Sequence, residues 1–179
     1  MAFPTPDAII GFWRQAGPER WYKKDPAFDA ELRSRFEPAH MAAARRELDA
    51  WADNAEGALA LLLLLDQIPR NIYRGTAHQF ATDPLARHVA ERAVTAGHHE
   101  AVEPLLRQFF VLPFEHSEAL AEQDRAVALA EYDPEILKWA GIHRDIIARF
   151  GRFPHRNPAL GRDTTPEEAA FLADGGFGG

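Results

Sequence analysis

The chain contains no cysteine among its 179 residues. Disulfide bonds, thiolate metal sites and thiol nucleophiles are therefore excluded. The absence of disulfides fits a reducing compartment, and we expect a cytoplasmic protein.

Long apolar runs are also missing. The most apolar run, Ala58–Leu65, has 8 residues, whereas a helix needs roughly 20 to cross a bilayer. The N-terminal stretch has no basic segment followed by an apolar core, so no signal peptide is expected. These absences predict a soluble protein with no membrane as a partner, in which the apolar run is a buried helix.

Positive charge is in short supply, since the formal net charge is -7. Binding to nucleic acid needs a surplus of Lys and Arg that neutralises phosphates, so nucleic acid is not an expected partner. Five arginines nevertheless lie between Ile142 and Arg162, with Asp145 as the single acid in that segment. This concentration of cations predicts a local site for an anion.

Alternating strand patterns are lacking as well, whereas helix signals are frequent. A capping residue followed by proline, the typical start of a helix, recurs at Thr5-Pro6, Asp25-Pro26, Asp83-Pro84, Asp133-Pro134 and Thr165-Pro166. Glycines at 17, 97 and 151 are stop signals, so helices are predicted near 6–16, 84–96, 134–150 and 166–173. Apolar spacing predicts further helices over 56–67, 102–112 and 117–132, and another from Pro26, which Pro38 should end or kink.

These elements predict an all-α fold of eight or nine antiparallel helices. The apolar share of 46% suits one core, and a chain of this length is short for two. We therefore expect a single domain over residues 1–179, built as a bundle or as a stack of helical hairpins.

Two stretches, "DQIPRN" (Asp66–Asn71) and "GRFPHRN" (Gly151–Asn157), are predicted to be turns that end helices. Asp66 and Arg70 have the spacing of an ion pair, and Asn71 is a typical capping residue. In the later stretch, cations such as Arg152 favour a helix C-terminus, and Asn157 before proline is typical of a turn.

Helix ends do not explain why His155 and Arg156 follow Pro154. Proline fixes its own backbone and drives Phe153 toward an extended conformation, so the next side chains are presented from a stiff segment. The guanidinium fork suits a carboxylate or a phosphate. His143 lies on the apolar stripe of the preceding predicted helix, either as a core residue or beside this site.

A third cluster, "LPFEHSE", contains Glu115, His116 and Glu118. A metal site would recruit these residues with His143 or His155. However, HExxH and the paired ExxH pattern of di-iron bundles are absent, as are a GxSxG elbow and a phosphate loop. We expect neither a metal nor another cofactor.

A series of motifs resembles the bacterial domain-of-unknown-function 924 family. The motifs are FDAELRSRF, LLLLLDQIPRNIYRGT, FATD, FVLPFEHSE, HRDIIARFGRFPHRN and LGRDTTPEEAAFL, in this order over nearly the whole chain. The resemblance implies a tetratricopeptide-like helical hairpin stack and no established activity. The family's characteristic positions correspond to Asp66, Gln67, Pro69, Arg70 and Asn71, to Glu115–Glu118, to His143, and to Gly151, Arg152 and Pro154–Asn157.

Three hypotheses about function follow. In the first, the two Pro-Arg-Asn stretches meet in one cleft that binds a small anionic ligand, and His143 or His155 acts as acid or base. The ligand would contact Arg70, Asn71, Glu115, His116, Arg152, Arg156 and Asn157.

In the second hypothesis, a concave helical face holds a peptide or protein without chemistry, using Trp13, Trp21 or Trp139. In the third, the motif residues only join helices. Whether the protein is an enzyme stays open.

Overall fold

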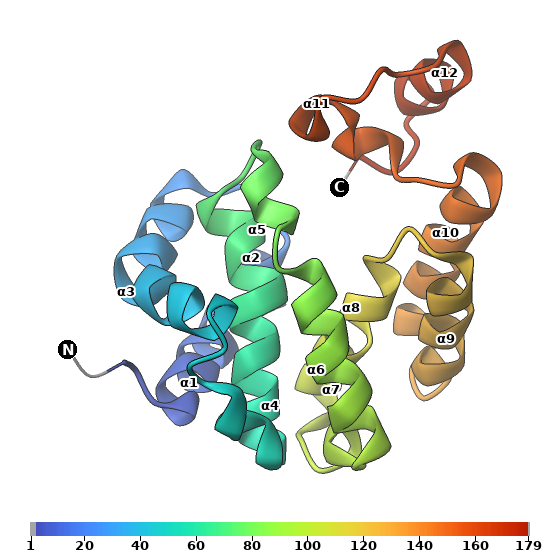
Figure 1. The fold of residues 1–179 in the computed structure, drawn as a ribbon. Helices are drawn as coiled ribbons and strands as arrows, with labels where there is room; N and C mark the ends of the chain where they lie inside the picture. Colours follow the sequence, from blue (N-terminus) through green and yellow to red (C-terminus); the bar gives the residue numbers. More distant parts are fainter. Residues whose placement is uncertain (1–2, 179) are drawn as a thin grey trace. The chain divides into compact units, whose positions relative to one another are not determined.

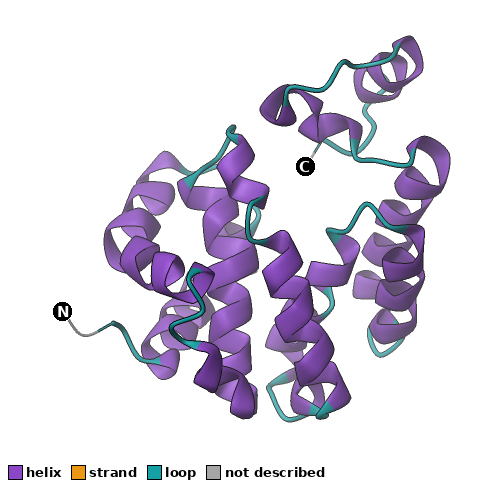
Figure 2. Ribbon diagram, viewed as in Figure 1, coloured by secondary structure: helices purple, strands orange, loops and turns teal. Residues whose placement is uncertain are grey.

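Helices make up the regular secondary structure of the computed structural model, which describes residues 3–178. No strand occurs among these residues (Figure 2). The predicted all-α class is therefore confirmed. The chain forms two compact units: the first contains the described residues up to Arg74 and His78–Pro113, and the second contains Gly75–Ala77 and the described residues from Phe114 onward. The expectation of one domain over 1–179 stays a prediction.

Three helices have the bounds that their capping signals indicated: α1 (Pro6–Ala16), α10 (Pro134–Phe150) and α12 (Pro166–Ala173). The Thr5 hydroxyl accepts the Ala8 N–H at 3.3 Å. Before α12, Thr165 and Glu168 form the capping box that satisfies two backbone donors reciprocally. Local side-chain chemistry therefore sets where these helices begin.

The helix α6 (Asp83–Thr95) begins differently from the prediction. Asp83 was expected to cap it, but Asp83 is its first helical residue and Thr82 precedes it. The Asp83 carboxylate instead accepts two hydrogen bonds from Arg70, at 3.0 Å each. A partner distant in sequence therefore takes the carboxylate away from its local capping role.

Pro38 does not end the helix in which it lies, contrary to one of the two predicted outcomes. α3 (Pro26–Ala44) continues through it. Proline inside a helix costs about 3 kcal/mol. Buried side chains on both sides, among them Phe36, Ala39 and His40, pack into the core, and this packing outweighs the cost.

The core of the first unit surrounds one long helical segment made of α4 (Ala55–Leu62), the π-helical turn η2 (Leu63–Gln67) and α5 (Ile68–Ile72). Every residue from 57 to 69 is buried. α1 and α6 pack against α4, and α3 packs against α5 (Figure 1). The unit also contains α2 (Pro18–Trp21), η1 (Asp49–Asp53), η4 (His98–Glu100), α7 (Pro104–Arg107) and η5 (Gln108–Phe110).

An aromatic cluster closes this core. Trp13 stacks on Trp21 with ring centroids 6.1 Å apart, and Phe109 lies 5.0 Å from Trp21. The Trp21 indole donates to the Trp13 carbonyl at 2.7 Å. Both tryptophans are buried, so they do not offer the exposed groove that the scaffold hypothesis assigned to them. Trp139 is 41% exposed.

The second unit is built on a hairpin of α9 (Leu120–Ala130) and α10. Asp133 starts α10 by accepting two backbone N–H groups. The chain then forms η6 (Pro154–Arg156), α11 (Asn157–Leu160) and α12. Its core contains Ile146, Ile147 and Phe153. The chain passes between the units at Arg74–Gly75 and within two short helices, η3 (Ala77–Phe80) and α8 (Leu112–Glu115). The finer likeness to a tetratricopeptide stack stays a prediction.

Candidate functional site

The "GRFPHRN" stretch begins as the predicted turn and continues as two single helical turns. Gly151 ends α10 with φ 69° and ψ 1°, the left-handed conformation that glycine adopts without strain. Phe153 is extended, with φ −89° and ψ 109°, as expected for a residue before proline. Pro154 then opens η6. The stiff presentation of His155 and Arg156 therefore comes from a helical turn.

Glu118 fixes the start of this stretch. Its carboxylate accepts the Phe153 N–H at 3.0 Å and two hydrogen bonds from Arg162, at 2.9 Å each. Burial alone would raise the pKa of Glu118, but these hydrogen bonds and the Arg162 charge outweigh it and lower the pKa. Glu118 thus holds the backbone of the site.

Arg152 and Asn157 converge on the carboxylate of Glu168. Arg152 donates to its two oxygens at 2.6 and 2.9 Å, and the Asn157 amide donates at 3.2 Å. The hydrogen bonds from Arg152, followed by that from the Thr165 N–H, lower the pKa of Glu168 to about 2. The guanidinium fork of Arg152 is therefore occupied inside the protein, which favours a structural role for it.

This network predicts a stability that depends on pH. Because its folded-state pKa lies below the unfolded value near 4.5, Glu168 contributes stability above pH 4.5 that is lost as the pH falls toward 2. We expect Glu168→Gln to be less stable than the wild type at pH 7 in urea denaturation, with the difference shrinking toward pH 2. Glu167→Gln is the matched control, because Glu167 is the exposed neighbour of Glu168 in sequence and pairs with Arg149. If the free energies of unfolding of Glu168→Gln and the wild type differed by the same amount from pH 7 to pH 2, the prediction would be contradicted.

Aromatic rings gather where α10, the stretch after it and the C-terminal residues meet in the second unit. We call this set the histidine cluster; its members are His116, His143, Phe153, His155 and Phe177. The His143 centroid lies 6.4 Å from His116, 5.7 Å from Phe153 and 4.6 Å from Phe177. His155 lies 5.5 Å from Phe153 and 5.3 Å from Phe177. Three predicted site histidines are therefore brought together.

His143 and Glu115 form a buried pair in this cluster. The His143 Nδ1 lies 2.8 Å from the Trp139 carbonyl oxygen and 3.4 Å from Glu115 Oε2. Since a carbonyl only accepts hydrogen bonds, Nδ1 carries the proton and Nε2 is the remaining nitrogen. A carboxylate beside Nδ1–H orients an imidazole and stabilises its protonated form, which suits an acid or base.

Arg156 supplies the cation of the cluster. The residue is buried, and its Cζ lies 4.4 Å from the centroid of the Phe153 ring. A guanidinium over an aromatic face gains cation–π energy, and the Arg156 charge also helps to lower the pKa of Glu118.

The sequence reasoning missed Gln123, which holds the Glu115–Ser117 turn in place. Its side-chain amide donates to the carbonyls of Glu115 and Ser117, at 2.6 Å each. Gln123 is fully buried. The sequence signal for this role is a glutamine on the otherwise apolar side of α9, where a buried amide needs hydrogen-bond partners.

The "DQIPRN" stretch is helical, so its prediction as a turn was wrong. It lies in η2 and α5, where the Ile68 N–H bonds to the Leu63 carbonyl five residues earlier. The π turn and the missing N–H of Pro69 leave carbonyls without backbone donors. His40 Nδ1 donates to the Leu64 carbonyl at 2.8 Å, and Thr82 donates to the Leu65 carbonyl at 2.5 Å. These side chains let the helix continue through the proline.

Arg70 and Asn71 also have partners within the first unit. Besides Asp83, Arg70 bonds the Asp66 carbonyl and lies 3.2 Å from the Asp66 carboxylate. Asn71 donates to Asp29 at 2.9 Å. The predicted Asp66–Arg70 pair is therefore present. The expectation that this stretch shares a cleft with "GRFPHRN" stays a prediction.

Comparisons with known proteins place the chain in a family. A family model described as "Bacterial protein of unknown function (DUF924)" matches residues 9–176. The chain belongs to this family. A solved structure described as a protein of unknown function, ATU0120 from Agrobacterium tumefaciens, is 55% identical, with a TM-score of 0.92 over 94% of this chain and 97% of that chain. No curated protein matches the chain.

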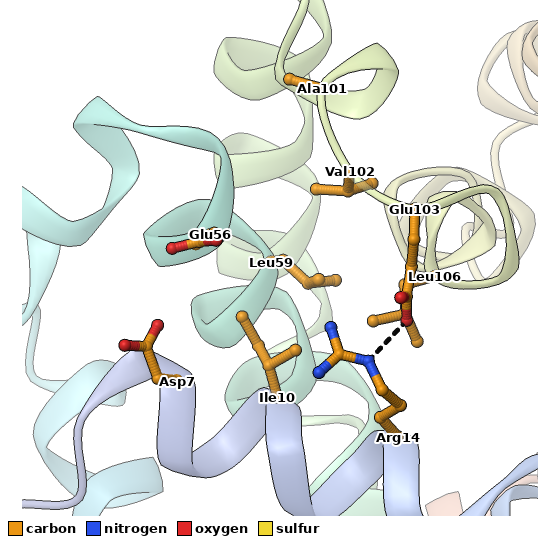
Figure 3. Close-up of a pocket in the computed structure, with 9 residues that line it drawn as sticks. All are labelled: Asp7, Ile10, Arg14, Glu56, Leu59, Ala101, Val102, Glu103 and Leu106. Atoms are coloured by element: carbon orange, nitrogen blue, oxygen red, sulfur yellow. Dashed lines mark hydrogen bonds and ion pairs between the residues drawn. The ribbon is translucent and has the colours of Figure 1, made fainter.

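This DUF924 protein has a hollow of about 380 Å³ in its first unit (Figure 3), lined by residues other than the family's characteristic positions. Its wall includes the apolar Ile10 and Leu59. Arg14 donates to Glu103 across it at 2.8 Å (Figure 3). With Arg14 paired and further acids at the rim, the hollow does not suit an anion.

Among residues 3–178 of this family member, no group of three or more His, Asp or Glu could hold a metal ion. Nor does any helix in the same range combine the length and the apolar character that a membrane span requires.

Proposed function

We propose that this DUF924 protein binds a small anionic ligand at the histidine cluster of its second unit. The buried guanidinium of Arg156 supports this most directly. It lies over the Phe153 ring, and the imidazoles of His143 and His155 contact the same ring. Guanidinium and imidazole N–H groups are donors that match a carboxylate or a phosphate. His155 is half-buried and adjacent in sequence to Arg156, so both present donors from one helical turn.

Within this proposal, His143 is the acid or base and Glu115 is its partner. Nδ1 contacts the Trp139 carbonyl and Glu115, which orient the imidazole, and we assign the proton exchange with the ligand to this imidazole. His116 is a further neighbour of His143, with ring centroids 6.4 Å apart. Glu115 orients the imidazole and stabilises its protonated form, as a buried carboxylate beside a histidine does.

Other predicted ligand-binding residues take supporting roles in this proposal. Arg152 and Asn157 hold η6 and α11 in place through Glu168. Arg70 and Asn71 bond to aspartates in the first unit. Their contacts support the structural reading of these four residues better than a direct role in binding.

The test is thermal unfolding in the presence of inorganic phosphate, sulfate or acetate. A ligand that binds the folded state stabilises it by about 2.7 kcal/mol at a concentration a hundred times its Kd, so the melting temperature should rise with concentration. Arg156→Gln should abolish the rise. Arg149→Gln is the matched control, because Arg149 is exposed and pairs with Glu167, and it should keep the rise.

Two results would contradict the proposal. One is an unchanged melting temperature with all three anions. The other is the same rise in wild type and Arg156→Gln. If Arg156→Gln does not fold, His155→Gln replaces it, because a half-buried histidine is less important for stability; its rise should then be reduced.

A further inference from the structure

The chain turns back sharply after α12. Gly175 has φ 80°, and the Gly176 N–H bonds to the Phe171 carbonyl at 2.9 Å. This is the bonding pattern of a left-handed helix C-cap. A Cβ at Gly176 would lie 2.5 Å from that carbonyl oxygen, so a side chain does not fit there. The two glycines therefore direct Phe177 back over the second unit.

Phe177 lies in a slot formed by three rings. Its centroid is 4.6 Å from His143 and 5.3 Å from His155, with interplanar angles of 63° and 81°. Trp139 lies 6.4 Å away at 57°. The two histidines contact Phe177 edge-to-face, an arrangement that aromatic rings prefer, whereas Trp139 is tilted against it. The slot therefore fits a flat six-membered ring, whichever molecule carries it.

The slot adjoins the cation of the proposed anion site. Phe153 contacts both: its ring lies beside His143 and His155, which line the slot, and Arg156 lies 4.4 Å above it. A ligand with a ring in the slot would have its anionic group near the donors of η6. Phe177 is only partly buried, belongs to a glycine-rich tail and packs against the core of Ile146, Ile147 and Phe153 from outside.

We propose that the Phe177 slot is the aryl subsite of the histidine cluster, and that the ligand is a small anion attached to an aromatic ring. This rests on the proposed anion site. Phe177 is then an intrachain competitor that a ligand must displace. A protein whose binding-competent state is one tenth populated binds about tenfold more weakly than its intrinsic affinity. The tail thereby sets the apparent affinity.

The test compares benzoate with acetate, which have the same carboxylate but differ in the ring. Calorimetric titration of Phe177→Ala should give a benzoate affinity about tenfold above that of the wild type, while the acetate affinity changes less than about twofold. Phe150→Leu is the matched control, because Phe150, like Phe177, is a partly buried ring packed against the core of the second unit. It should leave both affinities near the wild-type values.

Equal affinities of Phe177→Ala for benzoate and acetate would overturn the aryl subsite. The anion site would still stand in that case, provided that Arg156→Gln abolishes acetate binding. If neither benzoate nor acetate binds to the wild type or to Phe177→Ala, the anion site itself is overturned. If Phe177→Ala does not fold, Phe177→Leu takes its place, and an unchanged benzoate affinity there would also overturn the subsite.

Discussion

Replacing Arg70 by methionine is expected to lower the free energy of unfolding by about 3–5 kcal/mol. The side chain is 18% exposed and lies 3.0 Å from the Asp83 carboxylate and 3.2 Å from that of Asp66. Burial alone would lower the pKa of Arg70, but the two aspartates outweigh it and raise the pKa. Without the cation, two carboxylates remain buried together, and the Asp66 carbonyl loses a donor. Urea denaturation at pH 7 measures the change.

The matched control for this variant is Arg35→Met. Arg35 pairs with Glu31 one turn away on α3 at 3.0 Å, and its side chain is 57% exposed. Exposed pairs of this kind contribute about 0–1 kcal/mol, and methionine retains the apolar stem. If the two variants lose similar stability, Arg70 does not have the structural role that its contacts indicate.

Gly57→Ala is expected to destabilise the first unit by about 1–3 kcal/mol or more. A Cβ at Gly57 would lie 2.1 Å from the Trp51 carbonyl oxygen. That atom belongs to the backbone of η1, so relief requires α4 and η1 to separate. The shift would also disturb the hydrogen bond from the Gly57 N–H to Asn54, which caps α4. Urea denaturation is again the measurement.

Gly141→Ala provides the control, because Gly141 is also helical but has no atom within 4 Å of its Cβ position. Alanine in an unobstructed helix position is favoured over glycine by roughly 0.5–1 kcal/mol. The same substitution should therefore have opposite signs at the two positions. A stabilising effect at both would mean that α4 does not approach η1 as closely as described.

Helix starts were predictable because their causes are local. Thr5, Asp133 and Thr165 each accept backbone N–H groups of the next turn. Asp83 has the same local pattern, yet its carboxylate bonds to Arg70 thirteen residues away. A short stretch of sequence contains no signal for such a partner, which explains why that cap was predicted wrongly.

The helical "DQIPRN" stretch shows the same limit. Pro69 lacks a backbone N–H and therefore removes one hydrogen bond from the helix. The replacement donors, His40 and Thr82, come from positions 24 and 17 residues away from the carbonyls they serve. Burial lowers the pKa of His40, so a neutral imidazole donates there at neutral pH. Only packing of α3 and the start of α6 against η2 makes the continuation possible.

The sequence by itself determined the all-α class, the starts of the capped helices and the family, because these depend on residue types at short, fixed spacings. The tertiary structure decided how the polar motif residues are used. It assigned Arg70, Arg152 and Asn157 to internal carboxylates, and it placed His143 beside Glu115 and Phe177. The physical reason is that a hydrogen bond or a ring contact depends on distance in space, which residue spacing fixes only within one helix or turn.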